Sequence, residues 1–408
     1  MITLLKISWR NIWRNKARSF IIIAALIIGV IGAIFSAAVR LGVEQQQFKD
    51  TVGNQISHIQ IHHPEFIANP EARYRIPDGF QLAEEICNRP DVTITSPRTV
   101  FDGMGASANL TTGVRIKGID PGIEAITTGL DQLVQEGSYF SERGRLPSII
   151  IGKELANNLN SDVGSRIVLT FQDIEGEIVS SSFRVEGLYL VADKTFEKRT
   201  VFVDAKDLNQ LIGDTKAVTE IAVVLTDIDE YRNVASELQA AYPDTKVRHW
   251  ADIVPFLYFS LEFLERNLIW IFGLIILGVS FGLLNTILMS VLERVRELGV
   301  LMAIGMKKIK VFAMVVIETT MLSVIGGLIG LIISFGLVKY LSKHGLDLSG
   351  AGGEGLGEFG YASVIYPELA LAMYFQLGML IIVFAILAAL YPAWKAIRLV
   401  PAEAVRQE

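Results

Sequence analysis

Four long apolar runs interrupt a chain whose other segments mix polar and apolar positions. They are residues 19–39, 268–291, 311–338 and 369–391. A helix that crosses a bilayer needs ~20 mostly apolar residues, so the pattern predicts four transmembrane helices. Between the first two lies a polar segment, residues 40–266, which is the size of a domain or two.

The polar segment carries two periodicities. Alternation at every second position predicts strands at 58–62, 111–118, 149–151, 166–171, 182–191, 200–203 and 221–225. Helical spacing predicts helices at 79–88, 152–158, 205–212 and 230–241. Turn signals occur at Asp102-Gly103, Asp120-Pro121-Gly122 and Glu175-Gly176. The segment is therefore predicted to be an α+β domain of two lobes.

Two edge segments connect this domain to the predicted spans. Residues 41–50 extend the first span with a polar face, and residues 250–267 lead back with aromatic residues among acids. They are predicted to form stalk helices, and interfacial anchoring by the aromatic residues is an equal alternative.

Charge predicts the topology. Residues 41–265 carry 20 Lys and Arg against 34 Asp and Glu, a net of −14, and the rest of the chain carries +8. Positively charged short flanks stay in the cytoplasm, which places residues 1–18, 292–310 and 392–408 there. The domain and the loop 339–368 then face outward, in a multi-pass protein of the inner membrane. The acidic domain gives no support to nucleic-acid binding.

The first 18 residues have helical spacing of their own. Ile2, Leu5, Trp9, Ile12 and Trp13 share one face, which predicts an amphipathic helix in the cytoplasmic interface. A cleaved signal peptide ending near residue 38 is the alternative, but the apolar run is longer than the usual ~7–15 residues.

Motifs for catalysis and metal binding do not occur in the sequence. It contains no G-x-x-x-x-G-K-[ST] phosphate loop, no G-x-S-x-G and no H-E-x-x-H. The single cysteine, Cys87, excludes an internal disulfide. His58, His62 and His63 are close in sequence, but without a further ligand at suitable spacing we interpret them as polar strand residues. We expect no catalytic residue, no metal and no bound cofactor in this chain.

The third predicted span contains two features of interest. Glu318 is an acid inside a span, so it is a functional candidate; a hydrogen bond to a neighbouring helix near the cytoplasmic end is the favoured alternative. Gly326, Gly330 and Ser334 recur every four residues and predict close packing against another helix.

Three segments resemble the permeases of MacB/FtsX/Lol-type ABC transporters. They are LERVRELGVLMAIGMKKIKVF from residue 292, ETTMLSVIGGLIGLIISFG from residue 318 and the ending YPAWKAIRLVPAEAVRQE. In the domain, IIIGKELANNLNSDVGSRIVLT, FRVEGLYL and VFVDAKDL are similar to the family's extracytoplasmic domain. In layout the chain most resembles a lipoprotein-releasing permease subunit of the LolC/LolE type.

The resemblance implies a mechanism called mechanotransmission, in which ATP-driven closure of a cytoplasmic ATPase dimer is relayed through the spans to the outer domains. ATP and Mg would be bound by that partner, and two permease copies would pair as a homodimer or heterodimer. A cytoplasmic coupling helix within 293–305 would enter a groove on the ATPase. Its expected contacts are Glu293, Arg294, Arg296, Glu297, Leu298, Leu301, Met302, Ile304 and Gly305.

The cargo is expected to meet the protein at the outer leaflet, because the spans hold little to solvate a polar molecule. A lipoprotein or other lipid-linked substrate would pass Ile27, Ile31, Phe35, Phe256, Phe259 and Phe263, and a periplasmic carrier would receive it. Ordinary lipid contact is the alternative role of these side chains. Efflux of peptides or drugs, as in MacB-type pumps, remains an alternative function. Two further alternative functions are a membrane-tethered sensor and an FtsX-like activator of a cell-wall hydrolase.

Overall fold

The computed structural model describes residues 2–14, 16–108, 110–140, 144–348, 361–362 and 364–397. The predicted loop 339–368 and tail 392–408 therefore lie partly outside the described residues. The chain divides into two compact units. The bundle unit contains Met1–Val43, Glu262–Leu346 and Ile365–Glu408, and the sheet unit contains Glu44–Leu261 and Asp347–Val364.

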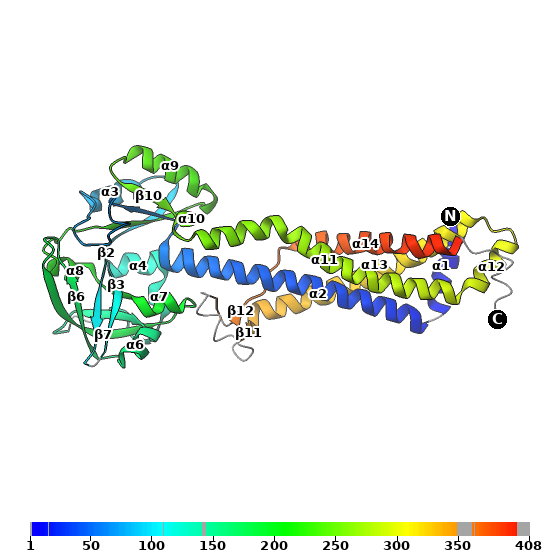
Figure 1. Ribbon diagram of the computed structural model, residues 1–408, viewed down its shortest axis with the longest axis horizontal. Coiled ribbons are helices and arrows are strands. Elements are labelled where there is room, and N and C mark those ends of the chain that lie inside the picture. The colour runs from blue at the N-terminus through cyan, green and yellow to red at the C-terminus, as the bar shows by residue number, and fades with distance from the viewer. Residues whose placement is uncertain are drawn as a thin grey trace. The chain divides into compact units, whose positions relative to one another are not determined.

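The bundle unit consists of helices (Figure 1). They are α1 (Ile2–Arg14), α2 (Lys16–Phe48), α11 (Pro255–Glu293), α12 (Val295–Ala303), α13 (Lys308–His344) and α14 (Leu371–Ile397), of which α2 and α11 continue into the sheet unit. Among the described residues, three helical stretches are long and apolar enough to cross a membrane: Ser19–Ile56, Lys308–His344 and Leu371–Lys395. The second predicted span lies within α11, many of whose side chains fall outside the described part of the chain.

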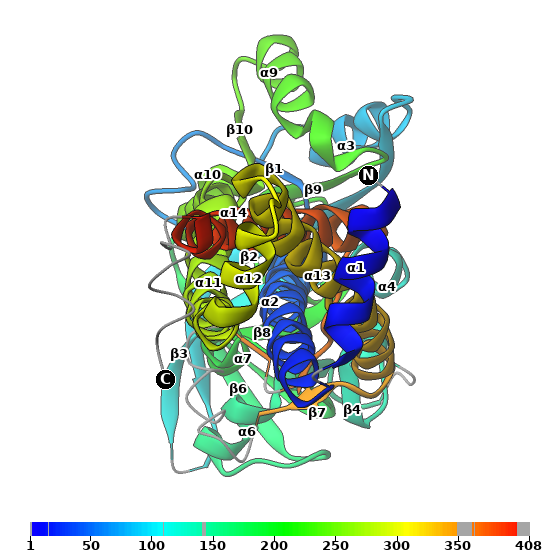
Figure 2. The same ribbon diagram turned by 90° about the vertical axis from the view of Figure 1, so that its right-hand side faces the viewer.

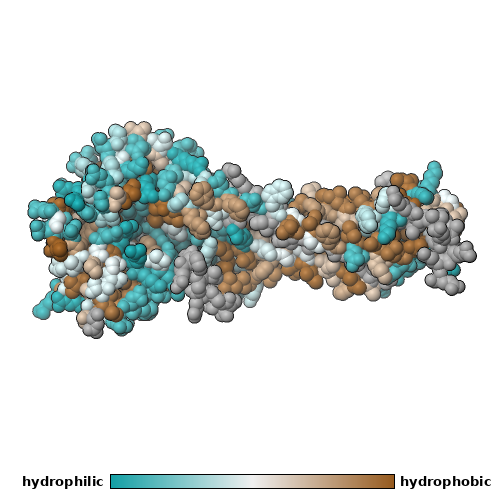
Figure 3. Space-filling model, viewed as in Figure 1, coloured by the Kyte–Doolittle hydropathy of each residue, from teal (hydrophilic) through white to brown (hydrophobic). Residues whose placement is uncertain are grey.

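The bundle is apolar both inside and outside. Its core includes Leu26 and Val30 of α2, Leu322 of α13, and Ile381 of α14, all almost fully buried. Large apolar side chains are also exposed around it, and Figure 3 shows hydrophobic colour over much of the bundle surface. A helix that is hydrophobic all round belongs in a membrane or a large core, so these helices have the surface that lipid requires.

The sheet unit is built on ten strands (Figure 1). Their order is β10-β1-β9-β2-β3-β8-β5-β7-β4, and β6 pairs with β2 and β7. The strands are β1 (Ile59–His62), β2 (Val92–Ala106), β3 (Thr111–Ile119), β4 (Val134–Gly137), β5 (Ser148–Gly152), β6 (Arg166–Gln172), β7 (Ile178–Tyr189), β8 (Thr200–Asp204), β9 (Glu220–Leu225) and β10 (Lys246–His249).

Short helices cover and connect the strands. They are α3 (Gly79–Cys87), α4 (Pro121–Thr128), α5 (Leu130–Leu133), α6 (Lys153–Leu159), α7 (Lys194–Arg199), α8 (Ala205–Leu211), η2 (Ile228–Glu230), α9 (Tyr231–Ala241) and α10 (Trp250–Ile253). The π-helix η1 (Lys49–Ile56) lies between α2 and β1. Two further short strands, β11 (Leu346–Asp347) and β12 (Val364–Ile365), pair with each other.

One long strand joins the two largest hydrophobic cores of the sheet unit. One core gathers side chains of β1, β9, α3 and α9, and the other gathers those of β3, β5, β6, β7 and β8. The 15-residue strand β2 pairs with β9 along its first half and with β3 and β6 along its second half. The predicted α+β composition and all seven predicted strands and four predicted helices are confirmed within a few residues.

The predicted turn at Asp102-Gly103 is wrong, because both residues lie inside β2. Asp102 is paired across the ladder with Arg115 of β3, and their side chains form an ion pair at 2.8 Å. A Cβ atom at Gly103 would meet Thr170 O at 2.9 Å. Glycine is therefore needed here for the close approach of β6 rather than for a turn.

The other two turn signals mark real changes of direction. Asp120 is the N-cap of α4, and its carboxylate accepts hydrogen bonds from the amides of Gly122 and Ile123. Asp120-Pro121-Gly122 therefore begins a helix rather than a simple turn, as Pro in the first helical position favours. Gly176, with φ of +90°, lies in the predicted turn between β6 and β7.

Candidate functional site

The predicted coupling segment forms the short helix α12. Arg294 separates it from α11, and Gly305, with φ of +102°, follows it and turns the chain toward α13. α1 and α12 lie at the same end of the bundle unit, and Figure 2 views the unit from this end. Two of the three segments that charge assigns to one side of the membrane are therefore together.

The apolar residues of α12 divide between its inner and outer faces. Leu298 is only 2% exposed and packs with Val291, Val311 and Met314. Leu301 and Met302 are partly buried against the same cluster. The side chain of Leu298 thus fills the chain's own core in this structure, and its entry into a groove on an ATPase stays a prediction.

The outer face of α12 presents different side chains. Val300 is 41% exposed and Ile304 is 79% exposed. Arg296 is exposed and makes no ion pair with any residue that the structure describes. This face combines two apolar side chains with a cation.

The other charged residues of the segment bind within the chain. Arg14 of α1 pairs with Glu297, and Arg294 donates to the same carboxylate at 3.3 Å. The hydrogen bond from Arg14 is the main reason that the pKa of Glu297 lies below its usual value. Arg294 Nη1 also donates to both carboxylate oxygens of Glu318, at 3.1 and 3.0 Å. These contacts join α1, α12 and α13.

α1 packs on α13, and Ser8 takes part in this contact. Ser8 is fully buried and donates to Met314 O at 3.3 Å, and Ile12 is fully buried as well. Leu5, Trp9 and Trp13 are between 41% and 48% exposed. The predicted apolar face of α1 is thus divided between two environments. Ile12 lies in the core of the bundle, and the indole rings of Trp9 and Trp13 are exposed, as expected of side chains at a membrane–water interface.

The small residues of α13 face α2. A Cβ atom at Gly330 would lie 2.8 Å from Val30 Cβ, and one at Gly326 would lie 2.9 Å from Leu26 Cβ. Ser334 is fully buried, and its hydroxyl donates to Gly330 O at 2.7 Å. Gly326 and Gly330 therefore line one close contact between α13 and α2.

The six positions of the expected cargo path are accessible. Phe256, Phe259 and Phe263 of α11 are between 63% and 71% exposed, and Ile27, Ile31 and Phe35 of α2 are partly exposed.

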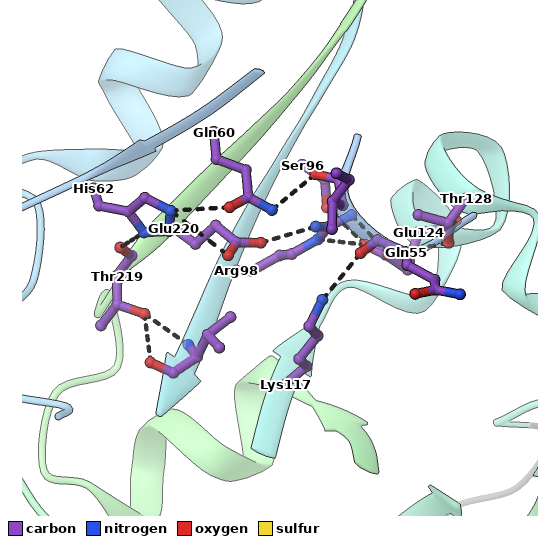
Figure 4. Close-up of polar contacts among 12 residues, drawn as sticks. Gln55, Gln60, His62, Ser96, Arg98, Lys117, Glu124, Thr128, Thr219 and Glu220 are labelled. Atoms are coloured by element: carbon purple, nitrogen blue, oxygen red, sulfur yellow. Dashed lines mark hydrogen bonds and ion pairs between the residues drawn. The ribbon is translucent and has the colours of Figure 1, made fainter. Parts of the chain in front are cut away.

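The sheet unit contains a buried polar cluster that the sequence pattern did not predict. Arg98 of β2 is completely buried and forms ion pairs with Glu124 of α4 at 2.8 Å and with Glu220 of β9 at 2.9 Å (Figure 4). Lys117 of β3 is also buried, and its ammonium donates to Gln55 O at 3.2 Å. Two cations thus balance two carboxylates, as burial of charge requires.

Burial and neighbouring charges shift the pKa values of three groups in this cluster, Glu220, Lys117 and His62. Burial alone would raise the pKa of Glu220, but Lys117 and Arg98 outweigh it and lower the pKa to about 2. Burial lowers the pKa of the Lys117 ammonium to about 8, in spite of Glu220. Burial also lowers the pKa of His62, whose ring contacts Thr219 O and Gln60.

Among the described residues, no group of three or more His, Cys, Asp or Glu side chains is arranged to hold a metal ion. His58 accepts a hydrogen bond from the amide of Leu225, and His62 belongs to the buried cluster. Both histidines therefore have partners within the sheet, as polar strand residues do.

A cavity of about 450 Å³ lies beside the buried cluster. Lys117, Gln60 and Glu220 line it from the sheet, Ile56 lines it from η1, and Ile253 lines it from α10. It is within the range of small-molecule pockets.

Comparison with known proteins identifies the family. Residues 19–241 match the MacB-like periplasmic core domain, and residues 269–401 match the FtsX-like permease C-terminal domain. The lipoprotein-releasing system transmembrane protein LolC of Xylella fastidiosa is 26% identical, over 72% of this chain and 73% of that protein.

Two further relatives are export proteins. The pyoverdine export ATP-binding/permease protein PvdT of Pseudomonas syringae is 25% identical, over 82% of this chain and 51% of its own length. The macrolide export ATP-binding/permease protein MacB of Wolinella succinogenes is 23% identical, over 99% of this chain and 60% of its own length. The chain therefore belongs to the family of ABC transporter permeases that combine a MacB-like periplasmic core domain with an FtsX-like permease C-terminal domain.

Proposed function

We propose that this chain is a permease subunit that works by mechanotransmission and extracts lipoproteins from the outer leaflet of the inner membrane. The observation that carries the proposal is the pairing of the two matched domains with a short helix, α12, whose outer face is apolar and cationic. Such a helix suits docking into a groove. In this proposal, a separate ATPase dimer binds ATP and Mg, and a second permease copy completes the complex.

The ATPase contact is proposed to use Ile304, Val300 and Arg296. Changing Ile304 to Asp would bring a charge into an apolar groove without opening this chain's own core, because the side chain is 79% exposed. The matched control is Ile126→Asp in the sheet unit, where the side chain is 73% exposed. We expect Ile304→Asp to abolish copurification with the ATPase and Ile126→Asp to leave it intact. Undiminished binding by Ile304→Asp would refute this contact.

The topology of the proposal places α1 and α12 in the cytoplasm and the sheet unit outside. In a Cys87→Ser background, a cysteine at Glu175, in the exposed turn between β6 and β7, should react with an impermeant thiol reagent in whole cells. A cysteine at Lys310, at the start of α13, should react only after lysis. The reverse pattern would overturn the orientation.

The cargo is proposed to contact α2 and the first half of α11. Support comes from the LolC relative, which matches nearly three quarters of both chains, and from the exposed aromatic residues of α11. Photo-crosslinkers at Phe35 and Phe259 should capture a lipoprotein in cells. A crosslinker at Phe375 of α14, which is 67% exposed, serves as the lipid-facing control.

Efflux from the periplasm is the second candidate function. The PvdT and MacB relatives favour it, since they match 82% and 99% of this chain. Efflux would be favoured by two results together. The crosslinkers at Phe35 and Phe259 would capture only the lipids that the crosslinker at Phe375 captures, and export of a soluble peptide or drug would require this chain. Lipoprotein extraction would then be rejected as the function.

A further inference from the structure

The segment that follows α2 has an unusual conformation. η1 is an eight-residue π-helix, and the amide of Ser57 closes it with a hydrogen bond to Val52 O at 2.8 Å, five residues earlier. Ser57 itself has φ of 68° and ψ of 175°, a strained combination for a residue with a side chain. π-helices are rare and usually a single turn long, and they occur often at functional sites. The surrounding structure must therefore hold η1 in this state.

Unsatisfied buried polar atoms gather at the same segment. Gln46 Oε1 lies just before η1, Gln55 Nε2 lies within it and Ser57 Oγ follows it. Trp250 Nε1 lies in α10, which packs against η1. None of these atoms has a hydrogen-bond partner among the residues that the structure describes. Each unmet group costs free energy, so these atoms lower the stability of the present conformation of this segment.

Two buried side chains hold the last carbonyls of η1 (Figure 4). Lys117 Nζ donates to Gln55 O at 3.2 Å, and Gln60 Nε2 donates to Ile56 O at 2.8 Å. The charge of Glu220 favours the protonated form of Lys117. Its ammonium is the one charged donor in this pair, and charged donors form the stronger hydrogen bonds.

Space for a second conformation lies next to the same residues. The cavity of about 450 Å³ is bordered by Ile56, the last residue of η1, and by Lys117 and Gln60. The end of η1 therefore borders open space on this side.

We propose that η1 is a junction with two states and that Lys117 is the positioning residue that selects the π-helical one. In the second state the bond between Lys117 Nζ and Gln55 O is broken. Ser57 N then bonds to Gly53 O, four residues earlier, as in an α-helix. Because η1 continues α2 directly, the state of η1 decides where α2 ends and β1 begins. A role in relaying motion from α2 rests on the proposed function, whereas the existence of the two states does not.

Hydrogen exchange of the full chain, measured by mass spectrometry in detergent, tests the proposal. The variant Lys117→Met with Glu220→Gln removes the donor and keeps the buried charges balanced, since Arg98 still pairs with Glu124. We expect exchange in residues 49–57 to rise on the order of tenfold, as loss of a charged hydrogen bond predicts. Residues 166–189, the β6–β7 hairpin of the same unit, should be unchanged.

Two further variants sharpen the test. Gln60→Met removes the neutral donor and should raise exchange in residues 49–57 by less. Lys153→Met removes an exposed lysine that pairs with Glu136 and should change nothing there. Wild-type exchange of residues 49–57 in the double variant would overturn the proposal. An equal rise in 49–57 and 166–189 would overturn it too, because Lys117 would then stabilise only the sheet. Neither result depends on transport or on an ATPase.

Discussion

Adding one methyl group at Gly330 tests the contact between α13 and α2. A Cβ atom there would lie 2.8 Å from Val30 Cβ and 3.4 Å from Ile27 Cα. Non-bonded carbon atoms are best separated by about 3.5–4.0 Å, so the two helices must move apart by about 0.7–1.2 Å. Overpacking of this kind costs ~1–3 kcal/mol.

Gly336 provides a matched control on the same helix. A Cβ atom there would meet nothing within 4 Å. Gly330→Ala and Gly336→Ala gain the same helix propensity, up to ~1 kcal/mol, so the difference between them isolates the steric cost. We expect Gly330→Ala to be less stable than Gly336→Ala by ~1–3 kcal/mol, measured by denaturant unfolding of the full chain in detergent.

A second substitution identifies the opposing atom. Val30→Gly removes the Cβ that Gly330→Ala would meet. It also lowers stability by itself, because Val30 is fully buried, so the expected result is coupling: Gly330→Ala should cost much less stability in the Val30→Gly background than in the wild type. Equal stabilities of Gly330→Ala and Gly336→Ala, or no coupling between positions 30 and 330, would refute the packing argument.

Three further predictions concern charged groups. Arg98→Met leaves Glu124 and Glu220 buried without their cation and should lower the free energy of unfolding by ~3–5 kcal/mol, measured by denaturant unfolding. Because the folded pKa of Glu220 is about 2 and its ordinary value is 4.5, its contribution of about 3 kcal/mol is present above pH 4.5. It is lost as the pH falls toward 2, so Glu220→Gln should flatten the pH dependence of thermal unfolding in this range. For the exposed pair Arg14–Glu297, a double-mutant cycle should give ~0.2–1 kcal/mol at low salt and nothing measurable at 1 M salt.

Sequence periodicity was sufficient for β6, whose side chains alternate between buried and more exposed positions. The local pattern was also sufficient for β1 and β8, which are buried along almost their whole length. It failed for β2, whose second half contains Asp102, Gly103 and Gly105, residues that normally mark turns. Contacts with neighbouring strands explain why these residue types stand there. Arg115 of β3 pairs with Asp102, and β6 passes so close to Gly103 that a side chain would not fit. Contacts between strands that are far apart in the sequence cannot be predicted from the local pattern of apolar and polar residues.

The same limit applies to the charged sites. Glu318 was recognised because an acid in an apolar span is conspicuous, and its partner Arg294 is 24 residues away. Arg98 and Glu220 are 122 residues apart, and each stands in a strand where a charge could equally face solvent. Only the strand order brings them together. The cation Arg98 in the interior of β2 was the available signal.

The position of β9 has a consequence for biogenesis. β9 lies between β1 and β2, which are consecutive strands in the sequence, and β10 completes the other edge of β1. A nascent chain therefore exposes β1 without either neighbour until residues 220–249 have been made. At ~5–20 residues per second this takes roughly 10–40 s after β1 emerges. Unpaired strand edges invite aggregation, so production of this protein should depend on a chaperone that shields β1 and β2 during this interval.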